Sequence, residues 1–214
     1  MIEAVLFDMD GVLVDSEAYI NKAGVLLFRE KGFDVQSEDF LEFTGMGEDR
    51  YLGGVAEKYG ISFDAVRDKA RAYEIYGKLV EGKLSPLPGV LEFIDRCKKK
   101  GLKIAVATSA DFVKLKINLE AIGIPLSTFD ATVNGLEIER KKPFPDIFLL
   151  AASRLQAAPS ECLVVEDAVS GVQAGKSAGA RVLGLTTTFT AEELSAADWI
   201  AKDLSDASPE VLEW

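Results

Sequence analysis

The hydrophobic positions of this chain follow two patterns, which divide the sequence into segments. Short, continuous apolar runs alternate with stretches of helical periodicity, first at Ala4 to Phe7 and then repeatedly after residue 84. Continuous apolar runs of this length are typical of parallel strands buried on both faces. The alternation of strand and helix therefore predicts a parallel sheet flanked by helices.

The strands and helices of the second part can be placed from the same pattern. We expect strands at 103–108, 131–133, 162–165 and 181–185, with an edge strand near 198–201. Helices are expected at about 90–100, 111–122, 145–157, 169–178 and 208–213.

Between the first strand and residue 84 the pattern is only helical. One helix is expected from Ser16 to Lys31, and further helical segments from about 37 to 81, broken at Gly45, Gly47, Gly53–Gly54 and Gly60. This insertion predicts a separate helical cap domain, 16–83, and a core domain made of 1–15 and 84–214. The expected fold class is α/β, with a Rossmann-like parallel-sheet core and an inserted α-helical cap.

Composition narrows the function classes. The chain has 214 residues and a net charge of −11, which argues against nucleic-acid or anionic-membrane partners. It has no histidine, so acid/base chemistry must use carboxylates, lysine or water. Its two cysteines do not suggest a disulfide framework, and no apolar stretch approaches the length of a membrane span. With no signal peptide visible, we expect a cytoplasmic protein.

Polar residues follow the first strand at the edge where an open α/β sheet binds ligands. Asp8 and Asp10 stand two residues apart there, just before Gly11. Two crowded carboxylates repel each other unless a cation lies between them, and Mg²⁺ is the hard cation that carboxylates and phosphate oxygens share. The alternative is that the two acids merely begin a polar loop.

Three more polar clusters follow later strands or their loops. Thr108, Ser109 and Ala110 could bind phosphate through hydroxyl and backbone N–H groups, although this cluster taken alone is better explained by Thr108 or Ser109 as a helix N-cap. Lys142, before Pro143, could supply a cation, or belong to a solvated basic turn. Glu166 and Asp167 end an apolar strand and offer further oxygen ligands, unless Asp167 only caps a helix.

In this order the four clusters resemble the four motifs of the haloacid dehalogenase superfamily, over the whole chain. The resemblance implies that Asp8 is the nucleophile and forms an aspartyl-phosphate. It implies that Asp10 is the acid/base and binds Mg²⁺ through its backbone carbonyl. Thr108, Ser109, Ala110 and Lys142 would hold the phosphoryl group, and Asp8, Glu166 and Asp167 would complete the metal site. A second acid two residues after the nucleophile favours phosphoryl transfer over dehalogenation.

Within the superfamily, residues 8–17 and the 142–148 segment are similar to the branch of β-phosphoglucomutase and small phosphatases. Mutases of that branch carry a cap histidine and a cap arginine, and the corresponding positions here are Ile20 and, approximately, Glu48. We therefore expect a Mg²⁺-dependent phosphatase acting on a small phosphorylated metabolite, as a monomer. A sugar phosphomutase is the alternative.

The cap loop is expected to contact the substrate. The candidates are Gly45, Met46, Gly47, Glu48, Arg50 and Lys78, and the alternative for the glycine pair is an ordinary helix–helix turn. The 45–56 and 107–111 segments also resemble the stromal haloacid-dehalogenase-like domain of the plant suppressor-of-quenching family. That resemblance implies an organelle stroma as a second possible location, and a non-catalytic phosphate-sensing or partner-binding domain as a third possible function.

Overall fold

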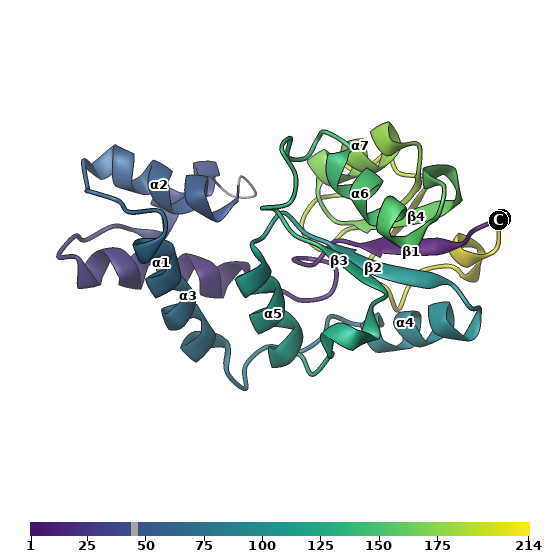
Figure 1. Cartoon of the computed structure of the whole chain (residues 1–214), viewed down its shortest axis with the longest axis horizontal. Helices are drawn as coiled ribbons and strands as arrows, with labels where there is room; N and C mark the ends of the chain where they lie inside the picture. The colour runs from purple at the N-terminus through teal and green to yellow at the C-terminus, as the bar shows by residue number, and fades with distance from the viewer. Residues whose placement is uncertain (44–46) are drawn as a thin grey trace.

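The chain folds into a parallel sheet with helices on both faces and a helical lobe beside its carboxyl edge (Figure 1). The structure is a computed structural model and describes residues 1–43 and 47–214. The six strands lie in the order β3-β2-β1-β4-β5-β6, and every pair is parallel. The predicted fold class is confirmed.

The strands form where the apolar runs predicted them. Their bounds are β1 Ala4–Phe7, β2 Lys103–Ala107, β3 Ala131–Val133, β4 Cys162–Glu166, β5 Arg181–Leu185 and β6 Trp199–Ala201. In the central strand β1, Phe7 pairs with Val106 of β2 on one side and with Val165 of β4 on the other. This register brings the residues after β1, β2 and β4 to one edge of the sheet.

Two layers of helices cover the sheet. Helices α4 (Val90–Lys99) and α5 (Phe112–Ala121) lie on one face, and α6 (Asp146–Leu155) and α7 (Val169–Ala178) lie on the other (Figure 1). Each layer has its own hydrophobic cluster, because alternate strand residues point to opposite faces. Phe7 and Phe93 pack edge-to-face in the first, and Leu6 packs near Phe148 in the second.

The segment between β1 and β2 is helical, as expected. It contains α1 (Glu17–Glu30), a 3-10 helix η1 (Ser37–Phe43), α2 (Glu48–Tyr59) and α3 (Arg67–Val80). Its buried side chains form a third hydrophobic cluster, which includes Phe28, Phe40 and Tyr76. This cluster also contacts Ile117 on α5, so the helical lobe packs against the core beside the sheet edge.

Two local predictions were wrong. Gly53–Gly54 does not break a helix, because α2 continues through both residues. A Cβ atom on Gly54 would lie 2.4 Å from the Phe43 ring, so this glycine allows close packing. The expected C-terminal helix is only a short 3-10 helix, η4 (Pro209–Leu212). Two more 3-10 helices, η2 (Leu126–Thr128) and η3 (Pro159–Glu161), precede β3 and β4.

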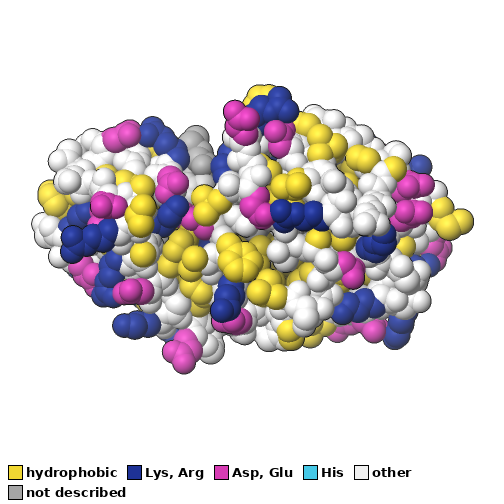
Figure 2. Space-filling model, in the orientation of Figure 1, with side chains coloured by type: hydrophobic (Ala, Val, Ile, Leu, Met, Phe, Trp, Pro, Cys, Tyr) yellow, Lys and Arg dark blue, Asp and Glu magenta, His cyan; other side chains and the backbone are white. Residues whose placement is uncertain are grey.

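The surface carries both signs of charge. Acidic and basic side chains are interspersed on the face shown in Figure 2, and a notch separates the helical lobe from the rest of the molecule. Among the described residues, no helix has the length and apolar character needed to cross a membrane.

Candidate active site

A cavity of about 480 Å³ lies between the carboxyl ends of the central strands and the helical lobe. The loops after β1 to β5 line it, together with α1 and the start of α2. It brings together at one place all the core residues that the sequence singled out: Asp8, Asp10, Thr108, Ser109, Ala110, Lys142, Glu166 and Asp167.

Asp8 is paired with a buried lysine. The Nζ atom of Lys142 lies 2.6 Å from Oδ1 of Asp8 and also donates to Glu166. Burial raises the pKa of Asp8 to about 7, although the charge of Lys142 opposes this rise. The same two carboxylates raise the pKa of the Lys142 ammonium above its usual range despite its burial. Lys142 therefore stays charged and neutralises part of the acidic cluster.

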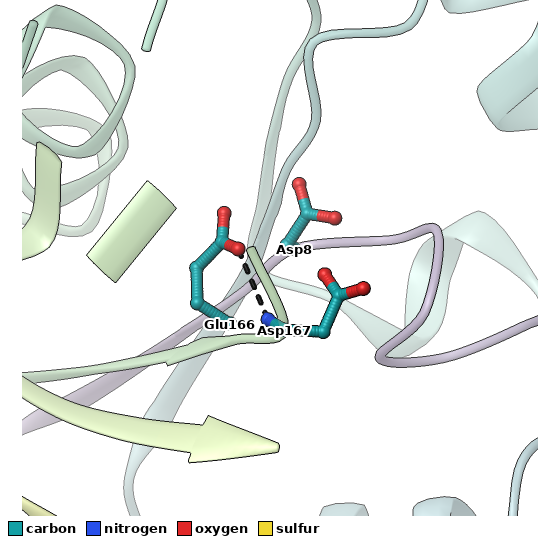
Figure 3. Close-up of side chains that lie close together, drawn as sticks. All are labelled: Asp8, Glu166 and Asp167. Atoms are coloured by element: carbon teal, nitrogen blue, oxygen red, sulfur yellow. Dashed lines mark hydrogen bonds between the residues drawn. The ribbon is translucent and has the colours of Figure 1, made fainter. Parts of the chain in front are cut away.

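Asp8, Glu166 and Asp167 form a group that could hold a metal ion. Each offers one carboxylate oxygen, and these oxygens lie within 4.8 Å of one another (Figure 3). Burial, together with the nearby charges of Glu166 and Asp8, raises the pKa of Asp167 to about 8. Three buried carboxylates with one lysine carry excess negative charge, and hard oxygen donors of this kind suit a divalent cation such as Mg²⁺.

The loop after β2 carries groups that could bind an anion. Thr108 is buried, and its Oγ1 accepts a hydrogen bond from the N–H of Ala110 at 3.1 Å. Ser109 and Ala110 line the cavity immediately before α5 begins at Phe112. N–H groups that precede a helix have no intrahelical acceptor, so they can donate to phosphoryl oxygens.

The side chain of Asp10 is held by polar groups of α5 and by the residue before α1. Its Oδ2 accepts a hydrogen bond from Lys114 Nζ at 2.8 Å, and its Oδ1 contacts Ser16 Oγ and Asn118 Nδ2. Asn118 in turn accepts from the hydroxyl of Tyr76 on α3. Sequence reasoning missed Lys114 and Asn118, although their spacing of four residues places them on one face of α5.

The loop after β5 was also missed. The hydroxyl of Thr188 donates to Asp167 Oδ2, and that of Thr187 donates to the carbonyl oxygen of Gly11 at 2.6 Å. Both threonines line the cavity. The rule applied to the other strands, that ligands bind beyond carboxyl ends, could have found them. Gly11 itself has a φ of 76°, and a Cβ there would lie 2.0 Å from Asp167 Oδ2.

Only some of the residues of the helical lobe that were expected to contact the substrate line the cavity. Gly47 and Glu48 line the cavity, and Glu48 is buried at the first position of α2. Arg50 lies outside it, where its guanidinium contacts Glu57 at 2.7 Å. Lys78 is exposed and does not line the cavity either. Gly45 and Met46 lie outside the described residues.

Comparison with known proteins agrees with this geometry. A model of haloacid dehalogenase-like hydrolases matches residues 2–179. The chain belongs to the haloacid dehalogenase-like hydrolase family. The family membership predicted from the four motifs is thus confirmed.

Relatives within the haloacid dehalogenase-like hydrolases include plant and bacterial proteins. The chloroplastic protein SUPPRESSOR OF QUENCHING 1 of Arabidopsis thaliana is 46% identical over 88% of this chain, which spans only 18% of that protein's length. Validoxylamine A 7'-phosphate phosphatase of Streptomyces hygroscopicus subsp. limoneus is 31% identical over 96% of each chain. The crystal structure of CbbY from Rhodobacter sphaeroides in complex with phosphate is 26% identical, covers all of both chains and superposes with a TM-score of 0.87.

Proposed function

We propose that this hydrolase is a Mg²⁺-dependent phosphatase that releases phosphate from a small phosphorylated metabolite through an aspartyl-phosphate on Asp8. The observation that carries the proposal is the ion pair of Asp8 and Lys142 in a cavity that Asp10, Thr108, Glu166 and Asp167 also line. The relative named as a phosphatase, which covers nearly the whole chain, supports the same reaction class.

In the first step an oxygen of Asp8 attacks phosphorus. The new Asp8–phosphorus bond forms as the bond to the leaving oxygen breaks, and Asp10 gives that oxygen a proton. Thr108 and the N–H groups near Ala110 orient the phosphoryl oxygens, while Lys142 offsets their charge.

In the second step Asp10, now ionised, takes a proton from water, which attacks phosphorus and displaces the Asp8 carboxylate. Asp8, Asp10 through its backbone carbonyl, Glu166 and Asp167 would hold the metal. Bound Mg²⁺ supplies positive charge that stabilises the phosphoryl group and keeps it in place. Inorganic phosphate then leaves and the site returns to its starting state.

The proposal assigns the helical segment a separate role. Residues 16–83 act as a cap domain that closes over the leaving group and excludes water, on a core of residues 1–15 and 84–214. The third hydrophobic cluster, which is centred in this segment, supports that division.

The test is phosphate release from a panel of phosphorylated metabolites with and without Mg²⁺, with isomerisation of β-glucose 1-phosphate followed in parallel. We expect Mg²⁺-dependent release, and its loss in Asp8→Asn, which keeps the side-chain shape and removes the nucleophile. Isomerisation without release would favour a mutase. Neither reaction, with any member of the panel, would favour a phosphate-sensing or partner-binding domain.

A further inference from the structure

A chain of hydrogen bonds leads from the helical lobe to Asp10. The hydroxyl of Tyr76, on α3, donates to Oδ1 of Asn118, on α5. At the other end of the same amide, Nδ2 of Asn118 lies 3.3 Å from Oδ1 of Asp10 and 3.4 Å from Oγ of Ser16. One amide group thus separates a side chain of the lobe from the carboxylate that the proposed mechanism uses as acid/base.

The hydrogen bond between Tyr76 and Asn118 is shielded from water. Both residues have an exposed fraction of 0%, so water does not replace either partner. Burial raises the pKa of Tyr76 to about 12, and the hydroxyl therefore keeps its proton and remains a donor. The next residues along the two helices also meet, since a Cβ atom on Gly77 would lie 3.8 Å from Cδ1 of Ile117. Helices α3 and α5 are therefore packed together around this hydrogen bond.

The hydroxyl of Tyr76 determines which end of the Asn118 amide faces Asp10. A side-chain amide has a donor end and an acceptor end, which a half-turn exchanges. With Tyr76 donating to the amide oxygen, the NH₂ group faces the Asp10 carboxylate and can bind it. In the reversed orientation the amide oxygen would face the carboxylate, and two acceptors repel each other. Tyr76 therefore stabilises the orientation in which Asn118 holds Asp10.

We propose that Tyr76 is a positioning residue, supplied by the helical lobe, that orients Asp10 through Asn118 for transfer of its proton to the leaving oxygen. Its role differs from that of Lys114, which binds the other carboxylate oxygen, Oδ2, directly. This inference rests on the proposed phosphatase function, in which Asp10 is the acid/base. It predicts that loss of the Tyr76 hydroxyl weakens proton donation and leaves attack on phosphorus otherwise unchanged.

The experiment compares two esters whose leaving groups differ in their need for a proton. An alkyl monophosphate from the panel would release an alkoxide unless Asp10 gave the oxygen a proton, whereas p-nitrophenyl phosphate releases a stable phenolate. The quantity compared is kcat/KM, because it includes the step in which the leaving oxygen departs. We expect Tyr76→Phe to lower kcat/KM about fivefold for the alkyl ester, from the loss of one hydrogen bond, and less than about twofold for p-nitrophenyl phosphate.

The matched control is Tyr73→Phe. It removes another buried hydroxyl of α3, which has no hydrogen-bond partner within the described part of the chain, and should change neither value. A second variant, Asn118→Leu, should give the same dependence on the leaving group as Tyr76→Phe. The double variant should lose no more than Asn118→Leu alone, because the two side chains act along one path.

Three results would overturn the inference while the phosphatase activity of the wild type stands. One is an equal fall for both esters in Tyr76→Phe, which would indicate a structural role only. Another is no fall for either ester, and the third is additive losses in the double variant, which would show that Tyr76 does not act through Asn118. A wild type that hydrolyses neither ester would overturn the proposed function itself.

Discussion

The Nζ atom of Lys114 lies 2.8 Å from Oδ2 of Asp10, and the lysine is almost completely buried. The charge of Asp10 helps to raise the pKa of Lys114 above its usual range although burial opposes it. The lysine thus remains charged and holds the Asp10 carboxylate in one orientation, together with Asn118. In a chain without histidine, this contact orients the group that we assign as acid/base.

Replacement of Lys114 by methionine is therefore expected to lower kcat more than it changes KM. We expect at least a tenfold loss of kcat, because Asp10 is no longer fixed, and a loss of about 2 kcal/mol in the free energy of unfolding. Steady-state kinetics and urea unfolding measure the two effects. Lys116→Met on the same helix is the control, since Lys116 is exposed and 3.7 Å from Glu120. An unchanged kcat in Lys114→Met would contradict the positioning role.

Lys69 joins the helical lobe to the core. Its Nζ lies 2.7 Å from Asp49 of α2 and 2.8 Å from Asp111, which precedes α5. Lys69→Met should raise KM about threefold, because the lobe loses a contact that holds it over the cavity. Lys58→Met is the matched control, since Lys58 pairs with Asp39 inside the lobe. If both variants raise KM equally, the bridge to Asp111 has no special role.

The pH dependence of stability is expected to change in Glu48→Gln. Burial raises the pKa of Glu48 from 4.5 to about 7. The folded protein therefore binds a proton more tightly than the unfolded chain, and this group reduces stability as pH rises from about 4.5 to 7. The free energy of unfolding of the variant should exceed that of the wild type by on the order of 2 kcal/mol at pH 8, and by much less at pH 5. Urea unfolding of both proteins at both pH values checks this. The same difference in unfolding free energy at pH 5 and at pH 8 would refute it.

Mg²⁺ should stabilise the protein through the three clustered carboxylates. At Mg²⁺ concentrations well above Kd we expect the Tm of the wild type to rise by about 5–10 °C. Removal of the ion with a chelator should return Tm to its value without Mg²⁺. Asp167→Asn should lose most of this rise, while Asp95→Asn on the exposed face of α4 keeps it. A full Mg²⁺ response in Asp167→Asn would show that the ion binds elsewhere.

That the residues at the strand ends would lie together could be predicted from the sequence, because strand ends obey a simple geometric rule. The carboxyl ends of β1, β2 and β4 must meet at one edge of a parallel sheet, so the strand pattern alone was enough to group Asp8, Thr108 and Glu166. Lys142 was found through the motif order and not through the geometry.

The remaining features could not be predicted, because they depend on how the helices pack against one another and against the strand ends. Lys114 and Asn118 lie within a regular helix, where periodicity alone does not distinguish a solvated lysine from one buried against Asp10. Glu48 was a candidate from its loop, but the sequence pattern does not show that it is buried. The break expected at Gly54 was wrong because its tight contact with Phe43 comes from η1, a separate element.

The central claim is that Asp8 carries the phosphoryl group between the two steps. The most direct test is a single-turnover reaction with a monophosphate that the enzyme hydrolyses. The reaction is quenched with acid, and the peptide that contains Asp8 is analysed by mass spectrometry. The account predicts a phosphorylated Asp8 that accumulates further in Asp10→Asn with a good leaving group such as phenolate, because water is no longer activated. Turnover that continues without any phosphorylated Asp8, or that survives in Asp8→Asn, would contradict it.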